Sequence, residues 1–374
     1  MSQQIEDLSL IQFLGKGSFG EVYLSTKKNS NKLFATKKIK KSIVDLPKMN
    51  RYFTYEIYIL KSINHPNIVK LEELKWDNNY YYIVMEYING GELSKCLEKY
   101  KNKYQRAFPE EIVQYLMRQI VDALIYIHDK NIIHRDLKLS NIMVHFDSDK
   151  DKEELNMMKA QIKIIDFGFA IMLPSKDSLT KTAVGTKLYM DPKILEKFYN
   201  EAKKDENRGY GREADIWSLG CICYTLFRGK IPFEAKNEKE LVAKINNGKY
   251  KIPKTASLEI ISFLDKMLRY EGNLRLSARE LKNEPFLKKN ISDFSYIDEN
   301  GLKKQNTFSE KPKNENNNLG SVQNNNSNYY RINSCSEPCF SYRLPNPIDP
   351  KLQFQKGMFS MNQFNNNMFK SNFQ

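Results

Sequence analysis

The chain has 374 residues, 41% of them hydrophobic, which is enough to fill the cores of two lobes or domains. Its formal net charge of +14 comes from lysines and arginines that are scattered rather than clustered, so we expect a solvated basic surface and no nucleic-acid partner. No apolar run reaches the roughly 18 residues of a transmembrane helix, and the five cysteines and four histidines form no disulfide framework or zinc pattern, which predicts a reduced protein of the cytoplasm or nucleus.

Strand-like patterns dominate residues 8–89. Short alternating runs such as 21–24 and 80–85 have the period of two that is typical of strands. One helix interrupts them at about 48–63, where aromatic and aliphatic residues recur at helical spacing. We therefore expect a small, strand-rich first part of the chain with a single helix.

Helical patterns dominate from residue 90 to about residue 288. Two charged segments, 147–160 and 198–209, break these patterns and are expected to be surface loops. This second part of the chain is therefore expected to be mainly helical. The stretches with helical periodicity are 109–128, 215–227 and 257–269.

The last part of the chain, 289–374, is rich in asparagine and poor in aliphatic residues. Such a sequence cannot bury enough apolar surface to offset the conformational entropy lost on folding, so we expect a mostly disordered tail. Its scattered phenylalanines and methionines are either docking points for partner proteins or parts of a tail without a binding role.

A glycine-rich loop lies near the start of the chain, where residues 15–20 read Gly-Lys-Gly-Ser-Phe-Gly. Glycines allow a backbone to approach phosphates closely and to offer amide donors to them. Dinucleotide-binding folds use a similar spacing, but their loop opens a helix. Here a strand pattern follows the loop, which predicts a hairpin that covers a nucleotide and argues against a dinucleotide-dependent oxidoreductase.

Two short motifs in the second part of the chain, 134–141 and 166–168, carry the residues of a phosphotransfer site. Transfer of phosphate from ATP to a hydroxyl requires a carboxylate that orients the hydroxyl and accepts its proton, a cation that neutralises the migrating phosphoryl group, and ligands that hold magnesium. The matching residues are Asp136 for the proton, Lys138 for the cation, and Asn141 with Asp166 for magnesium.

A lysine and a glutamate in the first part of the chain complete this set. An ATP site needs a cation on the α- and β-phosphates, and a carboxylate must fix that cation. Lys37 lies in a strand-like run, and Glu56 lies in the only helix nearby. Their order and location predict an ion pair at the phosphates, although Lys37 also has the lysine neighbours of an ordinary surface strand.

These motifs, in this order, are similar to those of the eukaryotic serine/threonine protein kinase family. The resemblance covers about 8–288 and implies the bilobal α+β protein kinase fold. The small N-lobe, about 8–89, would be an antiparallel β-sheet with one regulatory helix, and the larger, mainly helical C-lobe would span about 90–288. It also implies ATP and Mg²⁺ as cofactors and protein substrates as partners. The segments 166–170 and 185–190 are most similar to the autophagy-initiating kinases, followed by the calmodulin-dependent kinases.

The resemblance also assigns the nucleotide site. It implies that the glycines of the loop cover the phosphates and that Lys37 pairs with Glu56 in the active state. Met85 corresponds to the gatekeeper behind the adenine ring, and the backbone after it corresponds to the hinge that binds adenine. The ATP-binding residues implied in this way are Leu14, Gly15, Gly17, Gly20, Val22, Ala35, Lys37, Met85, Glu86, Tyr87, Ile88 and Met143.

Substrate preference follows from the same resemblance. A lysine at position 138 is typical of serine/threonine rather than tyrosine kinases, and Phe169 is associated with serine over threonine as acceptor. Glu92 is the only acidic residue left to meet a substrate arginine, so we expect no strong dependence on basic residues. Thr186 is expected to contact Asp136 and Lys138 at the substrate-docking surface.

Regulation is expected through the activation segment, 166–192. In the family, Arg135 is the usual partner of a phosphorylated residue, and Thr182 stands where that residue most often falls. An upstream kinase or the chain itself would add the phosphate. The second basic partners of some relatives are replaced by Tyr52 and Ile171, which predicts a weak phosphate pocket. The alternative phosphorylation sites are Thr180, Ser178 and Ser175.

One motif departs from the family pattern. Asp191-Pro192-Lys193 stands where relatives have Ala-Pro-Glu, and the Glu of relatives forms a buried ion pair with an arginine that matches Arg275. Lys193 would oppose Arg275, and an unpaired buried cation is costly. Either Lys193 turns to solvent, or a nearby carboxylate, Asp191 or Glu196, takes over the pairing.

The alternative to an active enzyme is a pseudokinase or scaffold, which would bind nucleotide and dock partners through its tail. Loss of Asp136, Asp166 or Lys37 would favour this alternative, and all three residues are present. Lys193 is the only residue that favours it.

Overall fold

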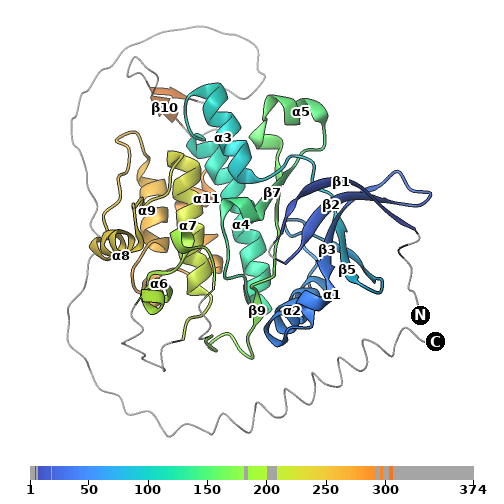
Figure 1. Ribbon diagram of the computed structural model, residues 1–374. Helices are drawn as coiled ribbons and strands as arrows, with labels where there is room; N and C mark the ends of the chain where they lie inside the picture. Colours follow the sequence, from blue (N-terminus) through green and yellow to red (C-terminus); the bar gives the residue numbers. More distant parts are fainter. Residues whose placement is uncertain are drawn as a thin grey trace, which may run out of the picture. The chain divides into compact units, whose positions relative to one another are not determined.

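The computed structural model describes residues 5, 7–17, 19–180, 184–199, 209–290, 295–297 and 303–305, all within the unit Met1–Ile332 (Figure 1). Five strands form a small lobe, and most of the helices form a larger one. The predicted bilobal α+β fold is confirmed. Within the described ranges, no helix combines the length and the apolar character needed to cross a membrane.

The N-lobe is one antiparallel sheet with the strand order β1-β2-β3-β5-β4. Strand β3 has neighbours on both edges, and Phe34 and Ile39 bury their side chains from it. The pairing of β1 with β2 is irregular next to the glycine-rich loop, which bends the hairpin there. The strands are β1 (Leu8–Lys16), β2 (Glu21–Lys27), β3 (Leu33–Lys40), β4 (Leu71–Trp76) and β5 (Tyr80–Glu86).

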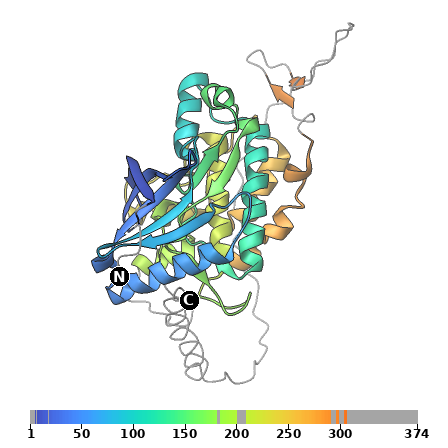
Figure 2. The same cartoon turned by 90° about the vertical axis from the view of Figure 1, so that its right-hand side faces the viewer.

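Helix α2 (Pro47–Ser62) lies beside this sheet, as Figure 2 shows. Ile59 and Leu60 are buried, so the aliphatic residues that predicted a helix form its inner face. The predicted range, 48–63, agrees within one residue at each end. A one-turn helix, α1 (Lys41–Val44), precedes α2 and has no sequence signal, because four residues are too few for a periodic pattern.

The C-lobe is built around α7 (Glu213–Arg228), which is buried throughout Ala214–Leu226. A helix that is buried on all sides belongs to the centre of a domain. Helix α4 (Glu110–Asp129) contacts α7 and buries its own aliphatic face. Apart from the short helix of the charged segment 147–160, the other helices of this lobe are α3 (Leu93–Tyr104), α6 (Pro192–Tyr199), α8 (Glu238–Asn247), α9 (Leu258–Met267), α10 (Ala278–Leu281) and α11 (Pro285–Lys288).

Two short antiparallel ribbons carry the sequence motifs. Strand β6 (Ile132–Ile133) pairs with β9 (Ile171–Met172), and β7 (Ile142–His145) pairs with β8 (Gln161–Ile164). The first motif connects β6 to β7, and the second connects β8 to β9. The pairing of these strands therefore brings the two motifs to the same place.

The charged segment 147–160 is more ordered than the surface loop that we expected. It contains α5 (Asp149–Glu154), whose first turn is capped by the hydroxyl of the preceding serine. Met157 follows α5 and is 1% exposed, so it anchors the segment to the C-lobe. Helix α5 has no buried residue, so the segment lies at the surface as predicted, but the prediction of a loop is wrong because a short capped helix forms there.

The predicted tail contains two described strands. Strand β10 (Ser295–Ile297) pairs with β11 (Lys303–Gln305) in an antiparallel ribbon, which has no clear sequence signal. The rest of the tail beyond residue 290 lies outside the described residues, and so do residues 200–208 of the second charged segment.

Candidate active site

A buried aspartate of α7 anchors the first motif. Asp215 Oδ1 accepts a hydrogen bond from the Arg135 N–H, and Oδ2 accepts one from the His134 N–H, each at 2.9 Å. The His128 imidazole lies 2.9 Å from Oδ2. Burial would raise the pKa of Asp215, but these hydrogen bonds and the nearby histidines hold that pKa below its ordinary value. The carboxylate therefore stays charged and holds the motif to the core of the C-lobe.

Left-handed backbone occurs in both motifs. Arg135 has a φ of 67° and Asp166 a φ of 59°, a conformation that costs about 1–3 kcal/mol at a non-glycine residue. Gly185, with a φ of 119°, passes so close to the first motif that a Cβ there would lie 2.5 Å from the Arg135 carbonyl oxygen. The activation segment can therefore approach the motif this closely only with glycine at position 185.

The carboxylate of Asp136 lies at the centre of a set of hydrogen bonds. Oδ2 accepts from Lys138 Nζ at 2.8 Å and from Asn141 Nδ2 at 3.0 Å, while Oδ1 accepts from the Thr186 hydroxyl at 2.8 Å. Lys138 Nζ also donates to Thr186 Oγ1 at 2.8 Å, so both contacts expected for Thr186 are present. Three donors thus fix the direction of a carboxylate that is 5% exposed.

A buried ion pair joins β3 to α2. Lys37 Nζ lies 2.7 Å from Glu56 Oε1 and 3.8 Å from Asp166 Oδ1. Burial opposes the charge of Lys37, but these two carboxylates raise its pKa above the ordinary value, so it stays a cation. The ring of Phe167 meets the ring of His134 edge-on, with centroids 5.0 Å apart, and this contact joins the two motifs.

Asn141 and Asp166 present oxygen atoms that fit Mg²⁺. The amide nitrogen of Asn141 donates to the main-chain oxygen of Asp136 at 2.8 Å, which leaves the amide oxygen as the group for a cation. The side chain of Asp166 is 22% exposed and ends in a carboxylate. Mg²⁺ takes hard oxygen ligands and is usually held by one or two carboxylates together with substrate phosphates. The two side chains therefore offer the kind of ligand that Mg²⁺ needs, and the metal site stays a prediction.

The glycine-rich loop is the turn between β1 and β2, and β2 rather than a helix follows it, as predicted. The Gly17 N–H donates to the Gly20 carbonyl oxygen at 2.8 Å. A Cβ at Gly20 would lie 2.2 Å from the Lys38 carbonyl oxygen, so only glycine lets the loop return this closely over β3. At Gly15 a Cβ would meet no described atom within 4 Å, which leaves room beside the backbone.

The predicted adenine-binding residues lie on neighbouring strands of the N-lobe sheet. Val22 on β2 is opposite Lys37, and Ala35 on β3 is opposite Met85. Leu14 lies near the end of β1 and is 43% exposed. The sheet therefore brings the N-lobe part of the predicted nucleotide site together around the ion pair.

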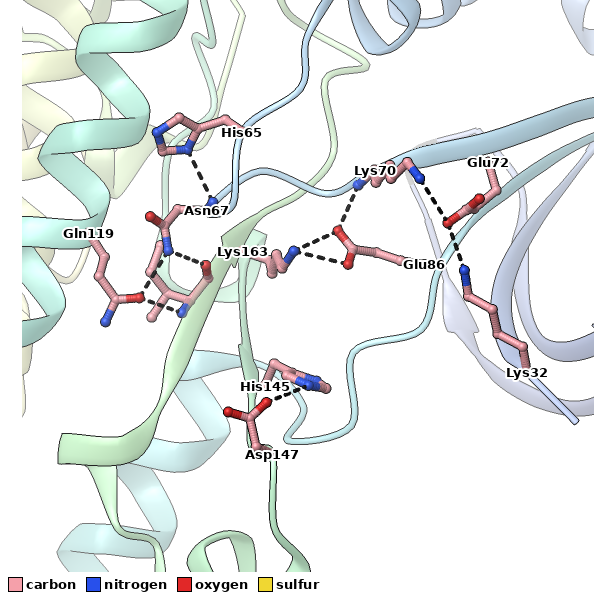
Figure 3. A network of polar contacts seen from close by, with 11 residues as sticks. Lys32, His65, Asn67, Lys70, Glu72, Glu86, Gln119, His145, Asp147 and Lys163 are labelled. Carbon is pink, nitrogen blue, oxygen red and sulfur yellow. Dashed lines mark hydrogen bonds and ion pairs between the residues drawn. The ribbon is translucent and has the colours of Figure 1, made fainter.

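A polar network fastens the predicted hinge to β8, as Figure 3 shows. Glu86 accepts hydrogen bonds from Lys163 Nζ at 2.9 and 3.0 Å and from the Lys70 N–H at 2.8 Å. The Glu86 N–H also donates to the Lys70 carbonyl oxygen at 3.1 Å, so the end of β5 is held through both its side chain and its backbone, and Tyr87 and Ile88, the other predicted hinge residues, follow directly. Sequence reasoning missed Lys163, since a lysine in a short strand carries no signal that its side chain is only 11% exposed.

Lys163 is also paired with Met143, the last of the predicted adenine-binding residues. It is opposite Met143 in the ribbon of β7 and β8, and Met143 forms a bridge with Glu92 ahead of α3. Glu92 itself accepts hydrogen bonds from Lys95 Nζ at 2.7 Å and from the Ser94 hydroxyl at 3.0 Å. The acidic residue that was expected to meet a substrate arginine is therefore already paired with a lysine of the chain.

Arg135 is held by the activation segment and by a residue that sequence reasoning missed. Its Nε donates to the Phe169 carbonyl oxygen at 2.6 Å. Burial raises the pKa of the Tyr210 hydroxyl, and the nearby Arg135 guanidinium opposes that shift. Tyr210 also exchanges two main-chain hydrogen bonds of 2.9 Å with Thr180. Tyr210 follows residues with no recognisable pattern, so no sequence signal could have identified it.

The predicted phosphorylation sites differ in exposure. Thr180 is 6% exposed, and its main chain is paired with Tyr210, so its hydroxyl is less accessible than an exposed one would be. Ser175 is exposed, and its hydroxyl lies 2.9 Å from that of Ser178. Thr182 lies outside the described residues. Among the described alternatives, an exposed hydroxyl is therefore available at Ser175.

The exchanged charges of the Asp191-Pro192-Lys193 motif are accommodated by two separate ion pairs. Arg275 NH1 pairs with Asp191 Oδ2, and the two side chains are 0% and 4% exposed. Lys193 turns outward, is 41% exposed and pairs with Glu271. The two alternatives stated from the sequence therefore occur together: Lys193 turns to solvent, and Asp191 pairs with the buried Arg275.

Asp191 has a second role at the start of α6. Its Oδ1 accepts hydrogen bonds from the N–H groups of Lys193 at 2.8 Å and Ile194 at 3.4 Å, which is how an N-terminal cap satisfies the first turn of a helix. Glu196, the other candidate partner of Arg275, instead accepts a hydrogen bond from the Tyr270 hydroxyl at 2.6 Å.

Comparison with known proteins agrees with this geometry. The family model described as "Protein kinase domain" matches residues 8–287. The chain is 35% identical to Calcium-dependent protein kinase 4 of Plasmodium falciparum (isolate 3D7) over 282 residues, which is 74% of this chain and 49% of that protein. It is 30% identical to Serine/threonine-protein kinase PLK4 of Drosophila virilis over 287 residues, 77% of this chain and 34% of that protein.

The chain thus spans about a third to a half of the length of these curated relatives. The matched region contains the glycine-rich loop, the buried ion pair, both motifs and the anchoring aspartate. The resemblance to the autophagy-initiating and calmodulin-dependent branches stays a prediction. The chain therefore belongs to the protein kinase family, in its eukaryotic serine/threonine branch.

Proposed function

We propose that the chain is an active protein kinase that transfers the γ-phosphate of ATP to serine and threonine hydroxyls of proteins. The observation that carries this proposal is the geometry around Asp136, whose carboxylate is held by three hydrogen-bond donors. The ion pair of Lys37 and Glu56 is formed beside Asp166 in the same domain. A base, a phosphate-binding cation and metal ligands are therefore set for one reaction.

The described residues account for the steps of this reaction. The substrate hydroxyl oxygen forms a bond to the γ-phosphorus, the bond from that phosphorus to the β–γ bridging oxygen breaks, and ADP leaves. Asp136 orients the hydroxyl and accepts its proton, while Lys138 neutralises the transferred phosphoryl group. Lys37 binds the α- and β-phosphates. When bound by Asn141 and Asp166, Mg²⁺ supplies positive charge to the β- and γ-phosphates.

A pseudokinase is the competing proposal, and its only support is Lys193. The buried pairing of Arg275 with Asp191 supplies the carboxylate that the family pattern takes from position 193. The exposed position of Lys193 places its charge outside the core. The departure in sequence therefore gives no structural reason for loss of activity.

Transfer of labelled phosphate from Mg-ATP to a generic basic protein, and to the chain itself, tests this function. Wild type is expected to transfer phosphate with Mg²⁺ and to lose this ability when EDTA removes the metal. The Asp136→Asn protein is expected to bind ATP and to transfer almost none. Binding of ATP by both proteins with transfer by neither would favour the pseudokinase.

We infer that serine is preferred over threonine as acceptor, because Phe169 follows the second motif. Peptides that differ only in the acceptor should show about tenfold higher kcat/KM for serine, the usual cost of an ill-fitting methyl group. The peptide with alanine at the acceptor position is the blank. Equal or faster turnover of the threonine peptide would contradict the inference.

Phosphorylation of Thr182 is proposed to increase activity only modestly. Arg135 would be its main cation, and Nε of that side chain is already used by the Phe169 carbonyl oxygen. The Thr182→Ala protein should therefore lose about two- to tenfold of the specific activity of a fully phosphorylated chain. Thr255→Ala is the matched control, because Thr255 is an exposed threonine outside the activation segment. Unchanged activity in Thr182→Ala would count against this role.

A further inference from the structure

Three aromatic rings from separate elements meet beside the phosphate-binding lysine. Phe19 belongs to the glycine-rich loop, Tyr52 to α2 and Phe169 to the activation segment. The ring centroids are 6.1 Å apart for Phe19 and Tyr52, 6.0 Å for Phe19 and Phe169, and 5.9 Å for Tyr52 and Phe169. Each ring therefore contacts the other two, and we call the three residues the aromatic triad.

The geometry of the triad is favourable for attraction between rings. The planes of Phe19 and Tyr52 are inclined by 15°, so these rings are stacked, whereas Phe169 meets them at 66° and 79°, edge to face. Stacked and edge-to-face pairs at such separations are the preferred arrangements of aromatic side chains. The Lys37 ammonium lies 5.5 Å from the centroid of the Phe19 ring, within the range of a cation–π contact.

Two of the rings are connected to residues of the active site, one along a helix and one through a hydrogen bond. Tyr52 precedes Glu56 by one turn of α2 and lies on the same side of the helix. The carbonyl oxygen of Phe169 accepts the hydrogen bond from Arg135, which directly precedes Asp136. The triad therefore links the ion pair on α2 to the backbone that carries the catalytic carboxylate.

All three rings are half-buried rather than enclosed in a core. A ring that only filled the interior of a lobe would be buried and would contact its own element and the layer beneath it. These rings instead join the loop, the helix and the segment that surround the phosphate site. Their contacts therefore bear on the relative placement of these elements more than on the stability of either lobe.

We propose that the aromatic triad positions the glycine-rich loop, α2 and the activation segment for phosphate transfer, so that the unphosphorylated chain has basal activity. The proposal rests on the proposed kinase function. Phe19 and Tyr52 are then positioning residues, which act through Lys37, Glu56 and the loop backbone. Ring contacts supply the connection between α2 and the activation segment, and attraction between aromatic rings requires no phosphate group.

Kinetics of the full chain after phosphatase treatment test this proposal. Tyr52→Ala should lower kcat/KM for ATP by about tenfold, because two aromatic pairs are lost. KM for ATP should rise as the loop is released, and kcat should fall as Glu56 loses its placement. Tyr52→Phe keeps the ring and should stay within about twofold of wild type. Tyr55→Ala is the matched control, since Tyr55 lies on the same helix with its ring near Arg51.

A second variant separates positioning from folding. Phe19→Ala changes a half-buried side chain of a loop and should cause a similar loss without a change in the thermal midpoint. Activity of Tyr52→Ala and Phe19→Ala equal to that of Tyr55→Ala would overturn the proposal while the kinase function stands. Failure of Tyr52→Phe to retain activity would also overturn it. If wild type transfers no phosphate either before or after phosphatase treatment, both the proposed kinase function and the proposed role of the aromatic triad are wrong.

Discussion

The Asp136→Asn protein should transfer phosphate about 10²–10⁴ times more slowly than wild type, the usual contribution of a general base. An amide has the shape of the carboxylate but cannot accept the proton of the substrate hydroxyl. It also presents an N–H₂ group to the donors Lys138, Asn141 and Thr186, so it fits only with that group in place of Oδ1, where the Thr186 hydroxyl can accept a hydrogen bond instead of donating one. The kcat from labelled-phosphate transfer measures the decrease in rate.

Binding of ATP separates loss of the base from loss of the fold. The affinity of Asp136→Asn for Mg-ATP, from titration calorimetry, should stay within about twofold of wild type, since Lys37 and the glycine-rich loop are unchanged. Asp147→Asn is the matched control, because the Asp147 side chain is 97% exposed on the loop after β7. A similar kcat in wild type and Asp136→Asn would exclude Asp136 as the base.

Replacing Asp191 with alanine should destabilise the folded chain by about 3–5 kcal/mol, the cost of leaving a buried charge without its partner. Arg275 is fully buried and donates to the main-chain oxygens of Glu213, Arg269 and Tyr270, so it cannot turn to solvent. The same substitution removes the cap of α6. Denaturant unfolding, with the midpoint and slope compared with wild type, measures the change.

Lys193→Ala is the matched control, since it removes the neighbouring ion pair. That pair is exposed, and its loss should change the free energy of unfolding by about 0–1 kcal/mol. Asp191→Ala combined with Lys193→Glu restores the family pattern and should recover part of the stability, if a glutamate at 193 reaches Arg275. An equal decrease in the free energy of unfolding in Asp191→Ala and Lys193→Ala would show that the buried pair of Asp191 and Arg275 stabilises the fold no more than the exposed pair does.

The parts of the site that follow local chemistry could be predicted from the sequence. The strand pattern after Gly20 predicts a hairpin, and the order of Lys37 and Glu56 predicts their ion pair. Both predictions follow from the type of element, strand or helix, in which these residues lie. The partner of Arg275 could be narrowed to Asp191 or Glu196 but not chosen. That choice depends on the direction of each side chain at the start of α6, which no spacing along the chain encodes.

Contacts between distant segments could not be predicted. Phe19, Tyr52 and Phe169 are far apart in the sequence and share no period, so only the folded chain brings their rings together. Lys163 resembles any lysine of a short strand until Glu86 is placed beside it. The helix α5 is hidden for another reason, since a short charged helix has no apolar face to detect.

The two ion pairs around Arg275 constrain the order in which this motif can have evolved. If an ancestor had the Ala-Pro-Glu of its relatives, a lysine at position 193 that arose first would have left Arg275 buried without a carboxylate. An aspartate at position 191 that arose first would have given Arg275 a second acceptor and a cap for α6, and position 193 would then have been free to change. The exchange is therefore passable only through an intermediate that carries both carboxylates, and a reversal would have to restore the glutamate at position 193 before Asp191 is lost.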